Sequence, residues 1–239
     1  DKTNIKSLKI KVGNKILKLV GQVDRIDKFE NYFRIIDYKT GRCDTSLKEL
    51  FFGKKVQLEA YLKVIENSLK LKPAGSYYMP VKSGIADESS TMQLKYQLKG
   101  RTVLDDDIII ASDAKLSTDC LSSDIIEVKF NKPDKDGNKN LSAYAKVATK
   151  KDMEILSNYA VDIIGRMCED ILSLNITPSP LVFSASDDPC KNCSYFALCR
   201  FDEKFKNVKR QPTAKITFDS FNNEIENVEL KSGKVTRVV

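Results

Sequence analysis

Two consecutive segments of this chain set its architecture: Gly21-Gln22-Val23-Asp24-Arg25-Ile26-Asp27 and Arg34-Ile35-Ile36-Asp37-Tyr38-Lys39-Thr40-Gly41. The β-branched residues before Asp37 favour a strand. Because residues two apart on a strand share a face, we expect Asp37 and Lys39 to project together and Tyr38 to point away. A hairpin turning near residues 29–31 would bring Asp24, on a preceding strand expected over residues 16–27, close to Asp37.

Two carboxylates and a lysine in this arrangement are typical of a site for a hard cation with a positive group beside it. An aspartate and a lysine next to apolar residues are costly to bury without a task. The alternative interpretation is a solvated ion pair on the surface, since charges two apart on a strand are common. The residues alone leave both interpretations open.

The composition limits the function further. The chain has 239 residues with 41% hydrophobic content, which is enough for one sizeable core. Its net charge of +7 suits a polyanionic partner. The absence of histidine excludes a Ser-His-Asp triad, a histidine base and a histidine-ligated zinc within the chain. No apolar run approaches membrane-span length and no signal peptide opens the chain, so we expect a cytoplasmic protein without a membrane partner.

The first half of the chain predicts strands followed by one helix. Residues 5–39 are expected to form two or three strands, with a hairpin turn at Gly13-Asn14. A helix is expected over residues 51–67, where apolar positions recur at helical spacing. Gln57 and Tyr61, four residues apart, lie on one flank of that helix.

The second half predicts further strands, a long loop region and a second helix. Strands are expected over residues 75–81, 92–98 and 101–104, the last two joined at Lys99-Gly100, and residues 105–140 are expected to be loops with one strand at 125–130. The second helix covers residues 150–174, and Thr149 with Asp152 resembles a capping box at its start. Its expected buried stripe is Met153, Leu156, Ala160, Ile163, Met167, Ile171 and Leu174. The tail, residues 206–239, carries two strand-like pieces around Ser232-Gly233.

A cysteine cluster is the second chemical signal. Cys190, Cys193 and Cys199 follow a C-x2-C-x5-C pattern. Clustered thiols in a chain without secretory features indicate a metal site rather than disulfides. The spacing suits zinc or an iron–sulfur cluster, both of which usually take four ligands. The fourth ligand could be one of the scattered cysteines or lie outside the chain, and three unligated cysteines are the alternative.

Together these motifs resemble the RecB-type branch of the PD-(D/E)xK nucleases. More closely, the chain looks like the C-terminal nuclease domain of the AddB subunits of AddAB helicase–nucleases, over about residues 8–205. The resemblance implies an α/β fold of the restriction-endonuclease type, in which α-helices flank a mixed β-sheet. Residues 1–205 would form the nuclease domain, and residues 206–239 a tail of unknown role. The matching segments, in order, are residues 21–27, 36–41, Gln57-Leu58-Glu59-Ala60-Tyr61, Pro73-Ala74-Gly75-Ser76-Tyr77-Tyr78, Leu98-Lys99-Gly100 and the cysteine cluster.

The same resemblance assigns roles to individual residues. Asp24, Asp37 and the backbone carbonyl of Tyr38 would ligate Mg²⁺ or Mn²⁺, which prefer oxygen ligands. Lys39 would orient the attacking water and stabilise charge developing on the phosphate. The other implied roles are the positioning of Lys39 or the DNA strand by Gln57 and Tyr61, and ligation of a [4Fe–4S] cluster by Cys190, Cys193 and Cys199.

The function implied by the resemblance is a metal-dependent (exo)deoxyribonuclease. It would cut single-stranded DNA delivered by an AddA-like helicase partner during double-strand-break repair and recombination. Two alternatives are a stand-alone Cas4-like exonuclease and a catalytically silent DNA-binding or scaffold module. Because the chain begins at Asp1, we expect a fragment that lacks the family's upstream metal-ligand helix and the fourth cluster cysteine. Such a fragment would bind metal weakly and show little activity alone.

Overall fold

The computed structural model describes most of the chain, in two compact units. The units are Asp1–Arg166 and Met167–Val239, and each is described by itself. No helix in the described part of the chain combines the length and apolar character needed to cross a membrane. The described residues are 7–41, 43–81, 96–117, 120–175, 177–184, 186–199, 201, 215–221, 227–230 and 233–236.

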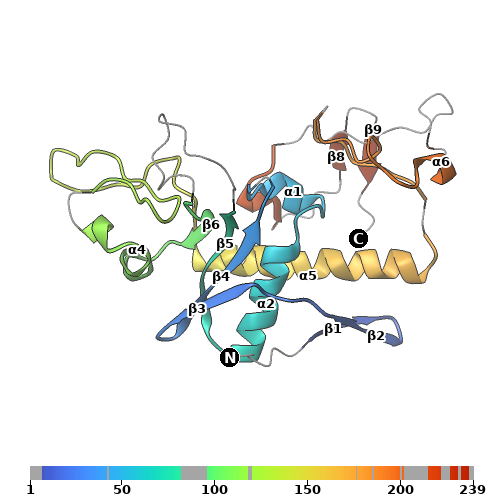
Figure 1. Ribbon diagram of the computed structural model, residues 1–239, viewed down its shortest axis with the longest axis horizontal. Helices are drawn as coiled ribbons and strands as arrows, with labels where there is room; N and C mark the ends of the chain where they lie inside the picture. The colour runs from blue at the N-terminus through green and yellow to red at the C-terminus, as the bar shows by residue number, and fades with distance from the viewer. Residues whose placement is uncertain are drawn as a thin grey trace. The chain divides into compact units, whose positions relative to one another are not determined.

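A five-stranded mixed sheet forms the centre of the first unit (Figure 1). Its strands, in spatial order, are β3 (Arg25–Phe29), β4 (Tyr32–Lys39), β5 (Lys72–Pro80), β6 (Lys99–Val103) and β7 (Val147–Ala148). The pairs β4–β5 and β6–β7 are parallel, whereas β3–β4 and β5–β6 are antiparallel. This arrangement agrees with the predicted mixed sheet flanked by helices.

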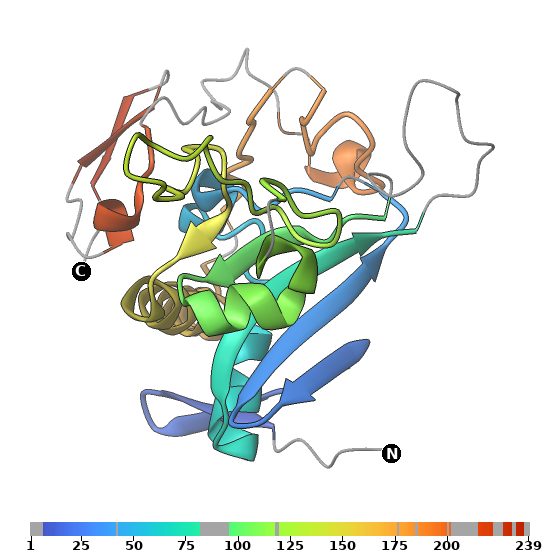
Figure 2. The same ribbon diagram turned by 90° about the vertical axis from the view of Figure 1, so that its left-hand side faces the viewer.

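Helices cover both faces of this sheet. Helix α2 (Gln57–Leu69) packs against β4 and β5, and α4 (Asp106–Ser112) packs against β6. Figure 2 shows α4 on the near face of the sheet and α2 behind it. The α4 face holds a buried cluster that includes Ile36, Tyr77 and Ile109. Because side chains alternate along a strand, Asp37 is directed to the opposite face, where α2 lies.

The long helix α5 (Lys150–Leu172) starts at the predicted capping box. The Thr149 hydroxyl donates to the Asp152 carboxylate at 2.7 Å and accepts from the Asp152 backbone N–H at 3.1 Å. The predicted buried stripe is correct for Met153, Leu156 and Ala160, which are buried. It is wrong for the later positions: Met167, Ile171 and Leu174 are 38%, 66% and 80% exposed. Helical spacing reports that one side of a helix is apolar, but not what faces each turn of it.

The first hairpin stands apart from the central sheet. Strands β1 (Leu8–Val12) and β2 (Lys15–Leu19) pair only with each other and are joined at Gly13, whose φ of 56° confirms the predicted turn. The strand expected over residues 16–27 is therefore two strands. The chain leaves the first hairpin after Leu19 and starts the second at Arg25.

Two predicted helix and strand boundaries are wrong. The helix expected over residues 51–67 is α1 (Leu47–Phe51) followed by α2, and Gly53 with φ of 79° lies between them. Apolar spacing continues across that break, so the pattern could not reveal it. The turn expected at Lys99-Gly100 lies inside β6, where Gly100 pairs with Tyr77. The strand expected over residues 92–98 falls largely outside the described residues.

The region of residues 105–140 contains more helix than predicted. Helix α4 and the 3₁₀ turn η1 (Ala114–Ser117) occupy its first part. The run Ile108-Ile109-Ile110 is β-branched and disfavours a helix by propensity, but packing of Ile108 and Ile109 against the sheet overrides that preference. The strand expected at 125–130 is reduced to isolated bridges, such as Leu98 with Ile126.

The second unit contains short elements. They are α6 (Phe196–Cys199), the 3₁₀ turn η3 (Phe218–Phe221), and the antiparallel strands β8 (Asn227–Leu230) and β9 (Gly233–Thr236). The hairpin suggested around Ser232-Gly233 is therefore present. The proposed domain boundary at residue 205 stays a prediction.

Candidate active site

The loop before β3 is tied to the end of β4 by a charge-assisted hydrogen bond. The Asp24 carboxylate accepts the backbone N–H of Tyr38 at 2.9 Å through Oδ2. The antiparallel register, in which Arg25 pairs with Ile36, brings these residues together. Asp24 thus lies just outside the strand rather than on it, but the predicted approach of Asp24 to the Asp37–Lys39 segment is confirmed.

Asp37 and Lys39 form a close ion pair at the end of β4. The Lys39 Nζ lies 2.6 Å from Asp37 Oδ2, and Asp37 is only 4% exposed. Tyr38, between them, is 42% exposed and points away, as predicted. The interpretation as a solvated surface pair is therefore wrong for Asp37, because burial of a carboxylate costs free energy that an ordinary surface pair avoids.

Gln57, the first residue of α2, joins this pair through both ends of its amide. Its Oε1 accepts from Lys39 Nζ at 3.4 Å, and its Nε2 donates to Asp37 Oδ1 at 3.5 Å. The same Nε2 donates to the Tyr61 hydroxyl at 3.2 Å, one helical turn further along. The chain therefore brings together Asp37, Lys39, Gln57 and Tyr61, four of the residues that the sequence singled out.

Gly21 lets the loop before Asp24 pass close to Tyr61. A Cβ at this position would lie 2.7 Å from the Tyr61 hydroxyl oxygen and 2.8 Å from its Cε1. Only glycine accommodates such an approach without a shift of the ring. The glycine at the start of the first motif thus has a steric reason that concerns the site itself.

Tyr78 is a site residue that the sequence reasoning missed. It lies directly opposite Asp37 in the parallel β4–β5 register, and Lys39 Nζ lies 5.5 Å from the centre of its ring, within cation–π range. Burial, reinforced by the charges of Glu59 and Asp37, raises the pKa of Tyr78, so its hydroxyl stays neutral. Parallel pairing of the two strands is the signal that could have found it.

A buried ion pair supports the site from behind. Arg101 on β6 and Glu59 on α2 are both about 5% exposed, with Nη1 and Oε1 3.3 Å apart. Arg101 also donates to the backbone carbonyl of Thr45 at 2.7 Å. Burial raises the pKa of Glu59 and lowers that of Arg101, and the charge of each partner opposes both shifts. This pair fixes the first turn of α2, which carries Gln57, against the sheet.

The donor set at Asp24 and Asp37 fits a hard cation. It offers carboxylate oxygens, and Asp37 Oδ2 is a buried oxygen that receives no hydrogen bond from the described residues, since Lys39 approaches it at ion-pair distance only. Such oxygens are the ligands that Mg²⁺ and Mn²⁺ prefer. In the described part of the chain, however, no three His, Cys, Asp or Glu residues gather as a metal-binding group.

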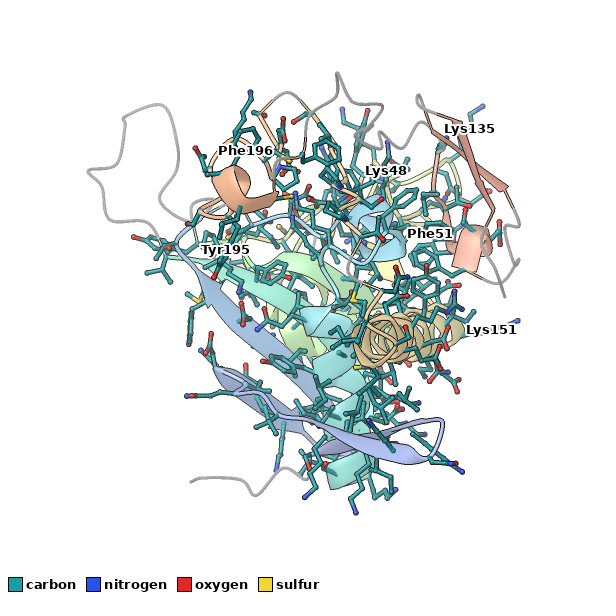
Figure 3. All side chains as sticks on the ribbon, turned by 90° about the vertical axis from the view of Figure 1, so that its right-hand side faces the viewer. Lys48, Phe51, Lys135, Lys151, Tyr195 and Phe196 are labelled. Atoms are coloured by element: carbon teal, nitrogen blue, oxygen red, sulfur yellow. The ribbon has the colours of Figure 1, made fainter. Side chains whose placement is uncertain are left out.

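The three clustered cysteines lie in the second unit. Cys190 is half-buried, whereas Cys193 and Cys199 are exposed, and none of the three is joined in a disulfide within the described residues. Backbone hydrogen bonds connect this turn, for example from the Cys199 N–H to the Tyr195 carbonyl at 2.8 Å. Tyr195 and Phe196 beside them are 71% and 51% exposed (Figure 3). The described residues do not assemble these thiols into a metal-ligand group, so the cluster prediction is not confirmed.

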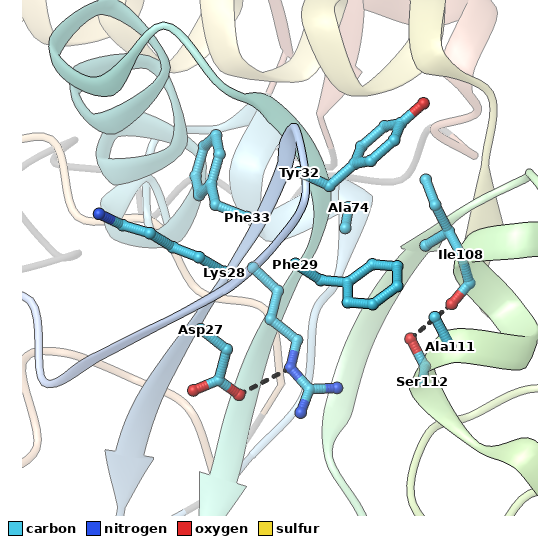
Figure 4. A pocket seen from close by; sticks show the side chains of 10 residues that line it. Asp27, Lys28, Phe29, Tyr32, Phe33, Ala74, Ile108, Ala111 and Ser112 are labelled. Atoms are coloured by element: carbon cyan, nitrogen blue, oxygen red, sulfur yellow. Dashed lines mark hydrogen bonds and ion pairs between the residues drawn. The ribbon is translucent and has the colours of Figure 1, made fainter.

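A cavity of about 150 Å³ lies away from this site. It opens between the β3–β4 turn and α4, where Phe29, Tyr32 and Ile108 line it (Figure 4). An ion pair between Arg34 and Asp27 closes one side at 2.9 Å. Neither Asp37 nor Lys39 lines this cavity, which is therefore separate from the candidate active site.

Comparison with known proteins gives one family match. The model of the PD-(D/E)XK nuclease superfamily matches residues 2–200. The chain is 36% identical over 219 residues to the AddB-type chain of the ATP-dependent helicase/deoxyribonuclease of Clostridium tetani, a match that covers 84% of the present chain. Proteins of the same name from Clostridioides difficile and Bacillus cereus are 33% and 28% identical, over 81% and 80% of the chain. The chain spans only 18%, 18% and 17% of the lengths of these three relatives.

Proposed function

Because this chain belongs to the PD-(D/E)XK nuclease superfamily, we propose that it is a metal-dependent deoxyribonuclease domain that hydrolyses phosphodiester bonds of single-stranded DNA. We further propose that it works beside an AddA-like helicase in double-strand-break repair. The similar proteins are named as subunits of a helicase/deoxyribonuclease, which favours a complex over a stand-alone exonuclease. The observation that carries the proposal is the contact set around the buried Asp37, in which Lys39 and Gln57 both take part.

We assign the metal to Asp24, Asp37 and the Tyr38 backbone carbonyl. A divalent cation bound there lowers the pKa of water and neutralises charge on the phosphate. Asp24 also holds the Tyr38 N–H, so the metal-binding and structural roles of this carboxylate are coupled. Any remaining ligands would be water or groups beyond these residues.

Lys39 supplies the positive charge that a histidine-free chain needs at the scissile phosphate. Its ammonium is held by Asp37 and Gln57 and faces the ring of Tyr78, so little conformational entropy is lost when a phosphate binds. From this position it would hold the attacking water and stabilise the developing negative charge. Gln57, fixed in turn by Tyr61, keeps Lys39 in place.

The proposal is tested by metal binding and by cleavage together. Mn²⁺ binding to the chain is expected to fall at least tenfold in Asp37→Asn, and cleavage of a single-stranded oligonucleotide to fall at least a hundredfold in Lys39→Ala, since removal of one such charge costs about this much. Lys28→Ala on β3, an exposed lysine outside the site, is the matched control. Because low activity is expected of this chain alone, cleavage is also measured in a full-length AddB protein.

Two results would count against a nuclease. Failure of the chain and of the full-length protein to bind Mn²⁺ through Asp37 would favour the silent DNA-binding or scaffold module. Cleavage that survives Lys39→Ala would move the catalytic centre away from β4. Loss of cleavage in Lys28→Ala alone would do the same.

We also propose that Cys190, Cys193 and Cys199 provide three ligands of a [4Fe–4S] cluster. The support is their C-x2-C-x5-C spacing and the exposure of two of the three thiols. Iron and sulfide content after anaerobic reconstitution tests this, with Cys168→Ser as the control. Equal iron content in Cys193→Ser and in the parent would exclude the assignment.

A further inference from the structure

The β1–β2 hairpin carries a one-sided cluster of lysines. Lys9, Lys11 and Lys18 are exposed, and residues 7–19 contain no aspartate or glutamate. The register pairs Lys9 directly with Lys18 and Lys11 with Ile16, so the three lysines share one face of the hairpin. None of these three lysines makes an ion pair with the described residues. We call this surface the lysine face.

The opposite face of the hairpin is apolar and is held against the rest of the first unit. Leu8, Ile10 and Val12 alternate with the lysines, and Val12 is only 8% exposed. A Cβ at Gly165 of α5 would lie 3.6 Å from Ile10 Cγ2, which is ordinary contact distance. The hairpin therefore packs through its apolar face and presents the lysine face outward.

The lysine face is electrostatically unfavourable in the protein alone. Like charges placed directly opposite on antiparallel strands destabilise the pair, as Lys9 and Lys18 do here. A protein that only needed a solvated strand could alternate the sign of these charges. A polyanion that covers the face turns the repulsion into attraction.

The hairpin also leads directly into the candidate active site. Only residues 20–23 separate the end of β2 from Asp24, a path of at most about 18 Å. Leu19 and Gly21 line a small cavity together with Tyr61, whose hydroxyl contacts Gln57. The base of the hairpin is thus anchored to the helix that positions Lys39.

We propose that the lysine face holds the phosphate backbone of the nucleic-acid strand whose scissile phosphate lies at Asp37 and Lys39. Lys9 and Lys11 are about 7 Å apart along the strand, comparable to the spacing of successive phosphates in an extended single strand. The contact is independent of base sequence, because lysines bind phosphates as point charges. This inference rests on the proposed nuclease function and adds the surface that binds substrate outside the catalytic centre.

The test is the salt dependence of single-strand binding. A triple variant, Lys9→Gln, Lys11→Gln and Lys18→Gln, keeps the side-chain stems and removes the charges. Binding of the full chain to a fluorescent single-stranded oligonucleotide is measured in EDTA, which suppresses cleavage. Each lost contact lowers the slope of log K against log salt by about 0.7, so three contacts lower it by about 2. The affinity difference should therefore shrink about a hundredfold between about 0.1 M and about 1 M salt.

Two controls separate this effect from other causes. The variant Lys132→Gln, Lys135→Gln and Lys151→Gln removes three exposed lysines elsewhere, two of which Figure 3 labels, and should retain most of the parent slope. The melting temperature of the hairpin variant without DNA should be equal to the parent's or higher, because repulsion between Lys9 and Lys18 is relieved. A purely structural role predicts a lower melting temperature instead.

The outcomes distinguish this inference from the proposed function. Equal slopes for the parent and the hairpin variant, with cleavage by the full-length parent intact, overturn the lysine face and leave the nuclease standing. An equal loss in the two triple variants shows that only net charge matters, and also overturns it. If the parent neither binds DNA nor cleaves it, the nuclease proposal itself fails. A hairpin variant that loses its helicase partner but keeps its affinity for DNA would assign the face to a protein partner and overturn the inference.

Discussion

Asp24 holds the backbone of Tyr38 at 2.9 Å, and this single contact joins the two halves of the sequence motif. The carboxylate reaches across the β3–β4 hairpin from a position just before β3. It stabilises the backbone between Asp37 and Lys39, whose side chains face α2. The site thus depends on Asp24 for geometry as well as for charge.

Two substitutions of Asp24 should separate these roles. Asp24→Asn keeps an oxygen that can accept the Tyr38 N–H, whereas Asp24→Ala does not. Both should lose Mn²⁺ binding and cleavage, but only Asp24→Ala should lower the free energy of unfolding, by about 1 kcal/mol. Urea unfolding and metal titration of both variants check this. Full activity in Asp24→Asn would mean that the carboxylate is only structural.

Gln57 should act on the rate rather than on the fold. Gln57→Leu removes both contacts to Asp37 and Lys39 on an exposed helix start, so we expect little change in stability. A freed Lys39 should lower kcat by roughly a hundredfold, the cost of a small misplacement. Tyr61→Phe removes one hydroxyl contact and should cost much less. Steady-state kinetics with both variants provide the measurement, and a change confined to KM would contradict a positioning role.

The buried pair of Arg101 and Glu59 should be costly to break from one side. Arg101→Met leaves a buried carboxylate unpaired and should destabilise the chain by about 3 kcal/mol or more. The double variant Arg101→Met with Glu59→Leu should recover most of this loss, because no buried charge remains. Chemical unfolding of the two singles and the double forms a complete cycle. Strict additivity would show that the two residues do not interact energetically.

Gly100 and Gly165 should respond oppositely to alanine. A Cβ at Gly100 would overlap the Ser76 carbonyl oxygen of β5, and backbone cannot move aside cheaply, so Gly100→Ala should cost about 3 kcal/mol. Gly165 lies inside α5 with room for a methyl group against Ile10, so Gly165→Ala should raise stability by up to about 1 kcal/mol. Thermal unfolding measures both. A neutral Gly100→Ala would place the β5–β6 pairing in doubt.

Asp27 should give stability that depends on pH. Burial alone raises the pKa of Asp27, but hydrogen bonds from Arg25 and Arg34 outweigh burial and lower it below its usual value. Its contribution, about 1 kcal/mol for a half-exposed pair, is therefore complete above the unfolded pKa of about 3.9 and disappears as pH falls through the lower native pKa. The difference in unfolding free energy between the parent and Asp27→Asn should follow this course. Asp136→Asn, in an exposed loop, is the control, and a difference that persists at the lowest pH would contradict the assignment.

The sequence by itself determined the local features of this protein. The β-branched lead-in and strand alternation were enough to direct Asp37 and Lys39 to one face, and the Thr149–Asp152 pair was enough to start α5. The Gly13-Asn14 turn followed in the same way. These features depend on interactions between residues close in the chain, where spacing alone fixes geometry.

Only the tertiary structure decided what those residues meet. Tyr78 reaches Lys39 because β5 pairs in parallel with β4, and Arg101 reaches Glu59 from a strand far along the chain. Gly100 serves as a close contact inside a strand rather than as a turn. Such contacts depend on register and packing between distant segments, whose free energy is not encoded in local periodicity. The sequence therefore named most of the candidate site, whereas the fold alone supplied its buried support and the outward direction of the lysine face.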